Sequence, residues 1–233
     1  MVAEHSEGTH ELVGRGHLIT EILSSITGSH YLGAMLVGEA GVGKTALARS
    51  VADALDGTVA VLPITASPSL HRVPFGALAP YLKSLSITDV GSSVAVYRSI
   101  MAHLETRRTD SSSLPLFLVD DSHELDDSTS VLLAQLVASR RAKILALSRS
   151  IPGPPTEFAS LWQDGLLHRY DLGPLNPQEV HELCVTELGG EVLTSVSVSL
   201  SRTSGGNPMF LLALLRQGQR SGYLQARNGI WRL

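Results

Sequence analysis

The segment GEAGVGKT, residues 38–45, carries the residue types that bind phosphate groups, and it matches the pattern G-x-x-x-x-G-K-[ST] at every fixed position. In such a loop the glycines let backbone N–H groups turn toward an anion. We expect Lys44 to reach the β and γ phosphates of a nucleotide and the Thr45 hydroxyl to bind Mg²⁺. The residues expected to contact the nucleotide here are Gly38, Glu39, Ala40, Gly41, Val42, Gly43, Lys44, Thr45 and Ala46.

Two carboxylates follow the apolar run LPLFLV, residues 114–119, which has the pattern of a strand buried on both faces. A divalent ion bound with phosphates needs a carboxylate at the carboxyl end of such a strand, so we expect Asp120 to bind Mg²⁺ directly or through water. Asp121 is the candidate for orienting the water that attacks the γ-phosphate. Two alternatives remain open: Asp121 caps only the following turn, or Glu124 takes the catalytic part.

Arg149 follows the apolar run KILALS, residues 143–148. Its guanidinium could approach the γ-phosphate and respond to its presence, or it could simply be a solvated arginine at the end of a strand. His123 could be a polar contact in the site or an ordinary residue at the start of the following helix.

The elements that must position these side chains alternate between strands and helices. This alternation predicts an α/β fold with a parallel sheet. The ranges with strand patterns are 31–38, 58–67, 114–121, 143–148 and 167–172. Helical patterns occupy 16–26, 46–55, 74–82 (interrupted by Pro80) and 94–106, with another helix after residue 121 that is capped by Ser128.

The pattern changes after residue 172. In LNPQEV, Asn176 is a good N-cap, Pro177 suits the first helical position and Glu179 can close a capping box. A helix follows at 192–202, and a third begins with Asn207 as cap and Pro208 in its first turn. We therefore expect a core domain at residues 1–172 and a small helical lid at 173–233. The last residues, GYLQARNGIWRL, look like the start of a further domain.

Composition excludes several classes of protein. Of 233 residues, 43% are hydrophobic and 17% are charged, as in folded globular chains. The net charge of −4 gives no overall basic field for nucleic acid. One cysteine, Cys184, cannot form an internal disulfide, and no apolar run is long enough to span a membrane. The first ten residues lack a signal-peptide pattern, so we expect a cytoplasmic protein.

Seven motifs in a fixed order point to a family: ELVGR, GEAGVGKTALA, PFGAL, FLVDDSHELD, LSRS, LGPLNPQEV and GGNPMFLLAL. The series resembles the N-terminal ATPase module of the large ATP-binding regulators of the LuxR family. These regulators are a branch of the STAND class, which is related to AAA+ proteins. The resemblance extends from about residue 11 to residue 233.

This resemblance implies a three-layer P-loop NTPase core with sheet order 5-1-4-3-2 and a helical lid, with ATP or ADP and Mg²⁺ held between them. It places Val13, Gly14 and Arg15 near the adenine and brings Pro208 to the nucleotide from the lid. In this family, ATP binding and slow hydrolysis switch a signalling protein, which can assemble as a nucleotide-dependent homo-oligomer. DNA contact would belong to a C-terminal domain absent from this chain, since no helix-turn-helix pattern occurs before Leu233.

The chain departs from the family patterns at two points. Gly16 and His17 follow Arg15, where the family usually has an acidic residue, and Asp121 stands where AAA+ ATPases generally have Glu. The shorter acid fits a slow switch. The main alternative is a stand-alone AAA+ ATPase, such as an oligomeric remodeller or loader, which needs an arginine from a neighbouring copy. A third candidate, a small-molecule phosphotransferase, lacks any visible motif for an acceptor.

Overall fold

The computed structural model describes residues 14–82, 85, 92–107 and 113–233. Two compact units make up this part of the chain. The sheet unit contains Ile19–Glu39 and Ala48–Leu172. The loop unit contains residues 14–18, Ala40–Leu47 and Gly173–Leu233. The phosphate loop therefore groups with the C-terminal part of the chain, although it directly follows a strand of the sheet.

The sheet unit is built on five parallel strands in the order β2-β3-β4-β1-β5, which confirms the predicted order 5-1-4-3-2. Because every pair is parallel, the carboxyl ends of all five strands lie at one edge of the sheet. The strands are β1 (Gly33–Gly38), β2 (Val61–Thr65), β3 (Leu116–Asp120), β4 (Lys143–Ser148) and β5 (His168–Leu172). Their ends lie within three residues of the predicted ones.

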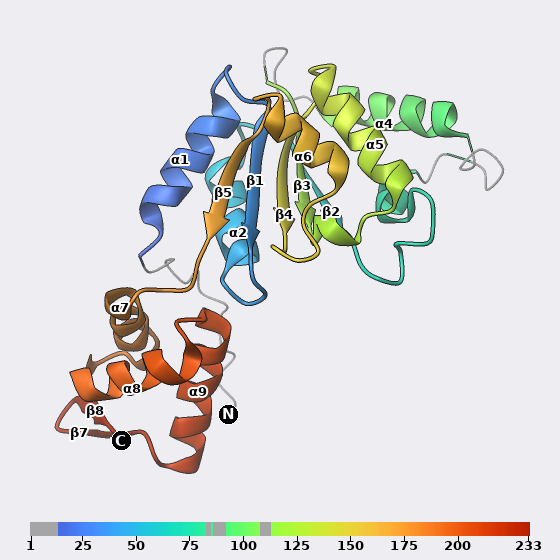
Figure 1. Ribbon diagram of the computed structural model, residues 1–233. Coiled ribbons are helices and arrows are strands. Elements are labelled where there is room, and N and C mark those ends of the chain that lie inside the picture. Colours follow the sequence, from blue (N-terminus) through green and yellow to red (C-terminus); the bar gives the residue numbers. More distant parts are fainter. Residues whose placement is uncertain (1–13, 83–84, 86–91, 108–112) are drawn as a thin grey trace, which may run out of the picture. The chain divides into compact units, whose positions relative to one another are not determined.

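Helices cover both faces of this sheet, giving the three layers of the predicted fold (Figure 1). The helices are α1 (Gly16–Thr27), α2 (Lys44–Ala54), η1 (Gly76–Tyr81), α4 (Ser93–Arg107), η2 (Ser122–Glu124), α5 (Asp127–Ala138) and α6 (Thr156–Gln163). One face packs against η1, α4, α5 and α6, and its buried strand residues include Met35, Phe117 and Ile144. The opposite face packs against α1 and α2, which both begin in the loop unit.

Two local predictions in the sheet unit are wrong, and one helix was not predicted. Asp126, not Ser128, caps α5, because its carboxylate accepts from both the backbone N–H (3.0 Å) and the hydroxyl (2.6 Å) of Thr129. The segment around Pro80 is a 3₁₀-helix that includes this proline rather than a helix that it interrupts. Helix α6 was not predicted from the sequence.

The loop unit combines three helices with a small sheet. Its helices are α7 (Pro177–Leu188), α8 (Thr194–Ser204) and α9 (Pro208–Ser221), and its strands are β6 (Glu191–Val192), β7 (Gln225–Arg227) and β8 (Ile230–Arg232). The predicted capping box of α7 is confirmed: Asn176 Oδ1 accepts from the N–H groups of Gln178 and Glu179, and Glu179 accepts from Asn176 N. Val180, Cys184 and Leu211 are fully buried in the core of this unit.

The last residues of the chain form the hairpin β7–β8. Asn228 and Gly229 make its turn with φ values of 53° and 79°, the left-handed pair that a type I′ turn requires. Strand β8 also pairs in parallel with β6, and Trp231 Nε1 donates to the carbonyl of Leu188 at 3.1 Å. These residues therefore complete the small sheet of the loop unit.

None of the helices that the structure describes has both the length and the apolar character needed to cross a bilayer.

Candidate functional site

The carboxyl edge of the parallel sheet gathers three of the segments singled out from the sequence. Strand β1 ends at Gly38, β3 ends at Asp120 and β4 ends at Ser148, one residue before Arg149. Only β4 separates β3 from β1. Since neighbouring strands lie about 4.8 Å apart, the ends of β1 and β3 are about 10 Å apart. Open α/β sheets bind ligands at this edge.

The phosphate loop follows β1 at this edge and runs directly into α2. Gly41 and Gly43 have φ values of 78° and 97°, so the loop uses the left-handed backbone conformation that glycine adopts without strain. Helix α2 begins at Lys44, and the N–H groups of its first turn have no carbonyl partner within the helix. A helix N-terminus of this kind attracts anions. Lys44 itself is only 8% exposed.

Three successive carbonyl groups of the phosphate loop accept hydrogen bonds from other parts of the loop unit. Asn207 Nδ2 donates to Ala40 O at 2.8 Å, and Met209 N donates to Gly41 O at 3.3 Å. Arg15 Nη1 donates to Val42 O. In a trans peptide the carbonyl and the following N–H point in opposite directions. The N–H groups that follow these three carbonyls therefore point away from the donors.

Arg15 is buried next to the phosphate loop, on the side of its carbonyl groups, with 6% of its surface exposed. Its Nη2 donates to Gly173 O at 2.7 Å, so one guanidinium joins the loop to the residue that follows β5. Burial lowers the pKa of Arg15 from its usual value, and the negative charge of Glu179 acts in the opposite direction. The predicted adenine contact of Arg15 stays a prediction, whereas its contact with the loop is a direct feature of the structure.

Other residues predicted near the base lie in the same unit or outside the described residues. A Cβ atom on Gly14 would lie 2.5 Å from Glu179 Cγ, so the backbone at Gly14 packs against the start of α7. Pro208 is the first residue of α9, next to Asn207. Val13 lies outside the described residues.

The two carboxylates after β3 differ in their surroundings. Asp120 Oδ1 accepts from the backbone N–H of Asp121 at 2.9 Å. Asp121 has φ 49° and ψ 44°, a left-handed conformation that aspartate tolerates better than most residues. Its side chain makes no capping hydrogen bond to η2, although it occupies the N-cap position, and it is 49% exposed. The structure therefore argues against the alternative that Asp121 only caps the turn.

His123 lies among these acidic groups. Its side chain is fully buried, and its Nε2 is 3.7 Å from Glu124 Oε1 and 4.0 Å from Asp121 Oδ1. Both separations are longer than a hydrogen bond, so the imidazole lies near the two carboxylates without a hydrogen bond to either. The interpretation of His123 as a polar contact in the candidate site stays a prediction. Arg149 is exposed at the end of β4, and its contact with a phosphate remains a prediction.

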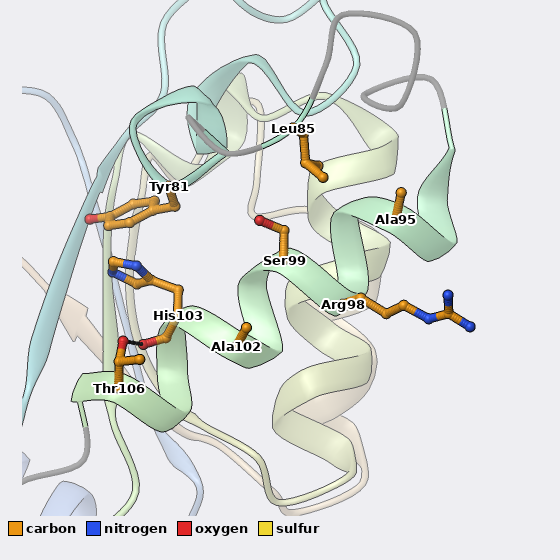
Figure 2. A pocket seen from close by; sticks show the side chains of 8 residues that line it. All are labelled: Tyr81, Leu85, Ala95, Arg98, Ser99, Ala102, His103 and Thr106. Carbon is orange, nitrogen blue, oxygen red and sulfur yellow. Dashed lines mark hydrogen bonds between the residues drawn. The ribbon is translucent and has the colours of Figure 1, made fainter.

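A separate hollow of about 520 Å³ lies between η1 and α4, and Figure 2 shows the side chains that line it. The rings of Tyr81 and His103 lie 5.2 Å apart, and Thr106 Oγ1 donates to the carbonyl of His103 at 2.8 Å. Arg98 extends away from these rings. None of the site residues predicted from the sequence lines this hollow, so it does not belong to the candidate site.

Sequence reasoning missed the part that Asn207, Met209 and Glu179 play around the loop. Asn207 is 167 residues from Ala40, and its motif was interpreted only as a helix cap. No local pattern predicts which carbonyl the other end of a capping side chain will bind.

Residues 11–148 match the family model described as AAA ATPase domain. No curated protein sequence matches the chain significantly.

Several solved structures share the fold. The Orc1 protein of Aeropyrum pernix, solved in complex with DNA, has a TM-score of 0.65 and 18% identity, and the match covers 95% of this chain and 63% of Orc1. Cdc6p from Pyrobaculum aerophilum has a TM-score of 0.63 and 14% identity, with 91% and 64% covered. The RuvB Holliday junction branch migration motor of Thermotoga maritima has a TM-score of 0.57 and 17% identity, with 88% and 60% covered. The chain thus spans less than two thirds of each of these proteins.

Proposed function

Because the chain belongs to the AAA ATPase domain family, we propose that it is a module that binds ATP with Mg²⁺ and hydrolyses it slowly. The main support for this proposal is a set of hydrogen bonds in the loop unit. In these bonds, residues distant in sequence donate to the backbone carbonyls of Ala40, Gly41 and Val42. With the carbonyls held this way, the N–H groups of the loop are left to face phosphate oxygens. In this proposal residues 1–172 are the ATPase core and residues 173–233 are the lid.

The donors of the loop suit a triphosphate. Backbone N–H groups from Gly38 to Ala46 would hold its oxygens, the N-terminus of α2 adds a positive dipole, and Lys44 adds a full charge at the β and γ phosphates. Gly14, Arg15 and Pro208, together with Val13, are the residues that we propose lie nearest the base. A buried lysine beside a bound phosphate exchanges hydration for a strong ionic hydrogen bond.

The proposed ligands of Mg²⁺ are the hydroxyl of Thr45 and the carboxylate of Asp120. Both are hard oxygen donors, which Mg²⁺ prefers, and few protein ligands are needed when phosphate oxygens and water complete the coordination. Bound Mg²⁺ would neutralise negative charge on the β and γ phosphates.

Asp121 is the proposed acceptor that orients the attacking water, and Arg149 the residue that responds to the γ-phosphate. The exposed side chain of Asp121 supports this assignment, because it is not committed to capping η2. The imidazole Nε2 of His123 lies 4.0 Å from its Oδ1. Since Asp121 is one methylene shorter than glutamate, it reaches less far toward the phosphates, and we expect slow turnover.

The order of the VGR, phosphate-loop, acidic and GNP motifs supports a role as the nucleotide switch of a cytoplasmic LuxR-family transcriptional regulator of the STAND class. In that role ATP and ADP would favour different conformations or assemblies of the protein. DNA would be bound by a different domain, because this chain is acidic overall.

An oligomeric AAA+ remodeller or loader is the alternative, and the shared fold with the RuvB motor and Orc1 favours it. Such an enzyme needs an arginine from a neighbouring copy to complete its site. ATP turnover per chain would then fall steeply on dilution below the assembly concentration. Turnover that stays constant across a dilution series, with a monomer seen in sedimentation, would exclude this alternative.

Replacing Lys44 tests the site directly. We expect Lys44→Ala to weaken binding of ATP with Mg²⁺ by about tenfold to a hundredfold, because an ionic hydrogen bond to phosphate is lost. Isothermal titration of both proteins measures this, and thermal unfolding without nucleotide checks that the variant is folded. Equal affinity in the two proteins would show that the nucleotide binds elsewhere.

Replacing Asp121 tests hydrolysis separately from binding. Asparagine adopts the left-handed conformation as readily as aspartate, so Asp121→Asn should keep the backbone and remove only the base. We expect turnover to fall about a hundredfold with nucleotide affinity nearly unchanged. Glu124→Gln is the matched control. If this control abolishes phosphate release and Asp121→Asn does not, Glu124 is the catalytic carboxylate.

A further inference from the structure

We propose that Asn207 and Arg15 are positioning residues. By donating to the carbonyls of the phosphate loop, on the side opposite its N–H groups, they hold the loop in its nucleotide-binding conformation. Through Asn207, the start of α9 would then set the affinity of the loop for phosphate. This inference rests on the proposed function, because the loop is taken to bind the phosphates of ATP. All the contacts that carry it lie within the loop unit.

The side chain of Asn207 makes two kinds of contact at once. Its Oδ1 accepts from the N–H groups of Met209 at 3.0 Å and Phe210 at 3.4 Å, which caps α9. Only the oxygen of an amide can accept these two bonds, so the cap fixes the orientation of the group. The Nδ2 atom therefore faces the loop, where it donates to Ala40 O at 2.8 Å.

Steric contact reinforces the link between α9 and the loop. A Cβ atom on Gly41 would lie 2.8 Å from both Asn207 Oδ1 and Met209 Cβ, so the loop backbone touches the first turn of α9. Met209 N also donates to Gly41 O. A rotation of the peptide groups at Ala40 and Gly41 would break both hydrogen bonds.

Arg15 holds the next carbonyl by a different route. Its planar guanidinium donates to Val42 O through Nη1 and to Gly173 O through Nη2. Gly173 directly follows β5 and is the first residue of the segment that leads to α7. Lysine has a single terminal nitrogen and could not reproduce the planar, two-pronged arrangement.

These contacts couple the lid to nucleotide binding in both directions. If α9 moves away, the carbonyls of Ala40 and Gly41 lose their donors and the loop is free to rotate its N–H groups out of the binding arrangement. If a bound phosphate orders these N–H groups, the carbonyls on the opposite side of the loop are oriented toward their donors, Asn207 Nδ2 and Met209 N. Thermodynamic linkage requires that contact with α9 strengthens phosphate binding by the same free energy by which phosphate binding strengthens the contact with α9.

The chain offers a matched control for this inference. Asn176 and Pro177 begin α7 as Asn207 and Pro208 begin α9, and Asn176 Oδ1 likewise accepts from two backbone N–H groups. Serine is also a good N-cap but is too short to reach Ala40 from position 207. Asn207→Ser should therefore keep the cap of α9 and lose the donor to the loop, whereas Asn176→Ser makes the same change away from the loop.

Two measurements on the full chain test the proposal. Hydrogen exchange without nucleotide should become faster at residues 40–46 in Asn207→Ser and stay unchanged there in Asn176→Ser. Titration with ATP and Mg²⁺ should show affinity about fivefold weaker in Asn207→Ser, as expected for one lost hydrogen bond, and unchanged in Asn176→Ser. Arg15→Lys should also speed exchange at residues 40–46, and the thermal unfolding of Asn207→Ser should match that of Asn176→Ser.

Loop exchange and ATP affinity that are the same in Asn207→Ser and wild type would overturn the proposal. Equal effects of Asn207→Ser and Asn176→Ser would also overturn it, since they would reflect only weaker helix caps. If the wild-type protein itself fails to bind ATP, the proposed function is wrong, and the exchange data alone then decide whether Asn207 holds the loop.

Discussion

A loop that binds phosphate through its backbone must keep its carbonyl oxygens away from the anion. Where such a carbonyl is buried it needs a protein donor, because an unpaired buried carbonyl costs about 1 to 3 kcal/mol; at the exposed Ala40, water is the competing donor. Here Asn207, Met209 and Arg15 supply donors to three successive carbonyls. The conformation of residues 40–42 therefore depends on groups that lie far from them in the sequence, and the proposed binding of ATP depends on that conformation.

Each of the two units carries its own set of charged groups. The loop unit places two cationic side chains, Arg15 and Lys44, in buried positions at the loop. The sheet unit places Asp120, Asp121 and Glu124 after the end of β3, with the imidazole of His123 next to the last two. Cations beside the loop complement phosphate oxygens, and carboxylates at the strand end complement a divalent cation.

Local patterns in the sequence were enough to predict the five strands, the phosphate loop and the cap of α7, whereas the order of the strands in the sheet was implied by the resemblance to a known family. These features depend on residues close together in the chain, such as Asn176 and Glu179, or on a buried strand running into glycines. The cap of α5 was placed wrongly because Asp126 and Ser128 are both good caps, and the choice depends on Phe75, whose N–H binds Asp126 from far away in the sequence. The Asn228-Gly229 pair is itself a sequence signal for the hairpin β7–β8. The bond from Asn207 to Ala40 could not be predicted, because it exists only once the two segments are folded together.

The most direct test of this account is a crystal structure of the full chain with Mg²⁺ and an ATP analogue that resists hydrolysis. The account predicts β and γ phosphates bound by the N–H groups of residues 41–45 and by Lys44, with Mg²⁺ between Thr45 and the Asp120 carboxylate. The Asn207 and Arg15 bonds to the loop should be intact. Phosphates bound elsewhere, or Lys44 and Asp120 facing unconnected regions with the nucleotide in place, would contradict it.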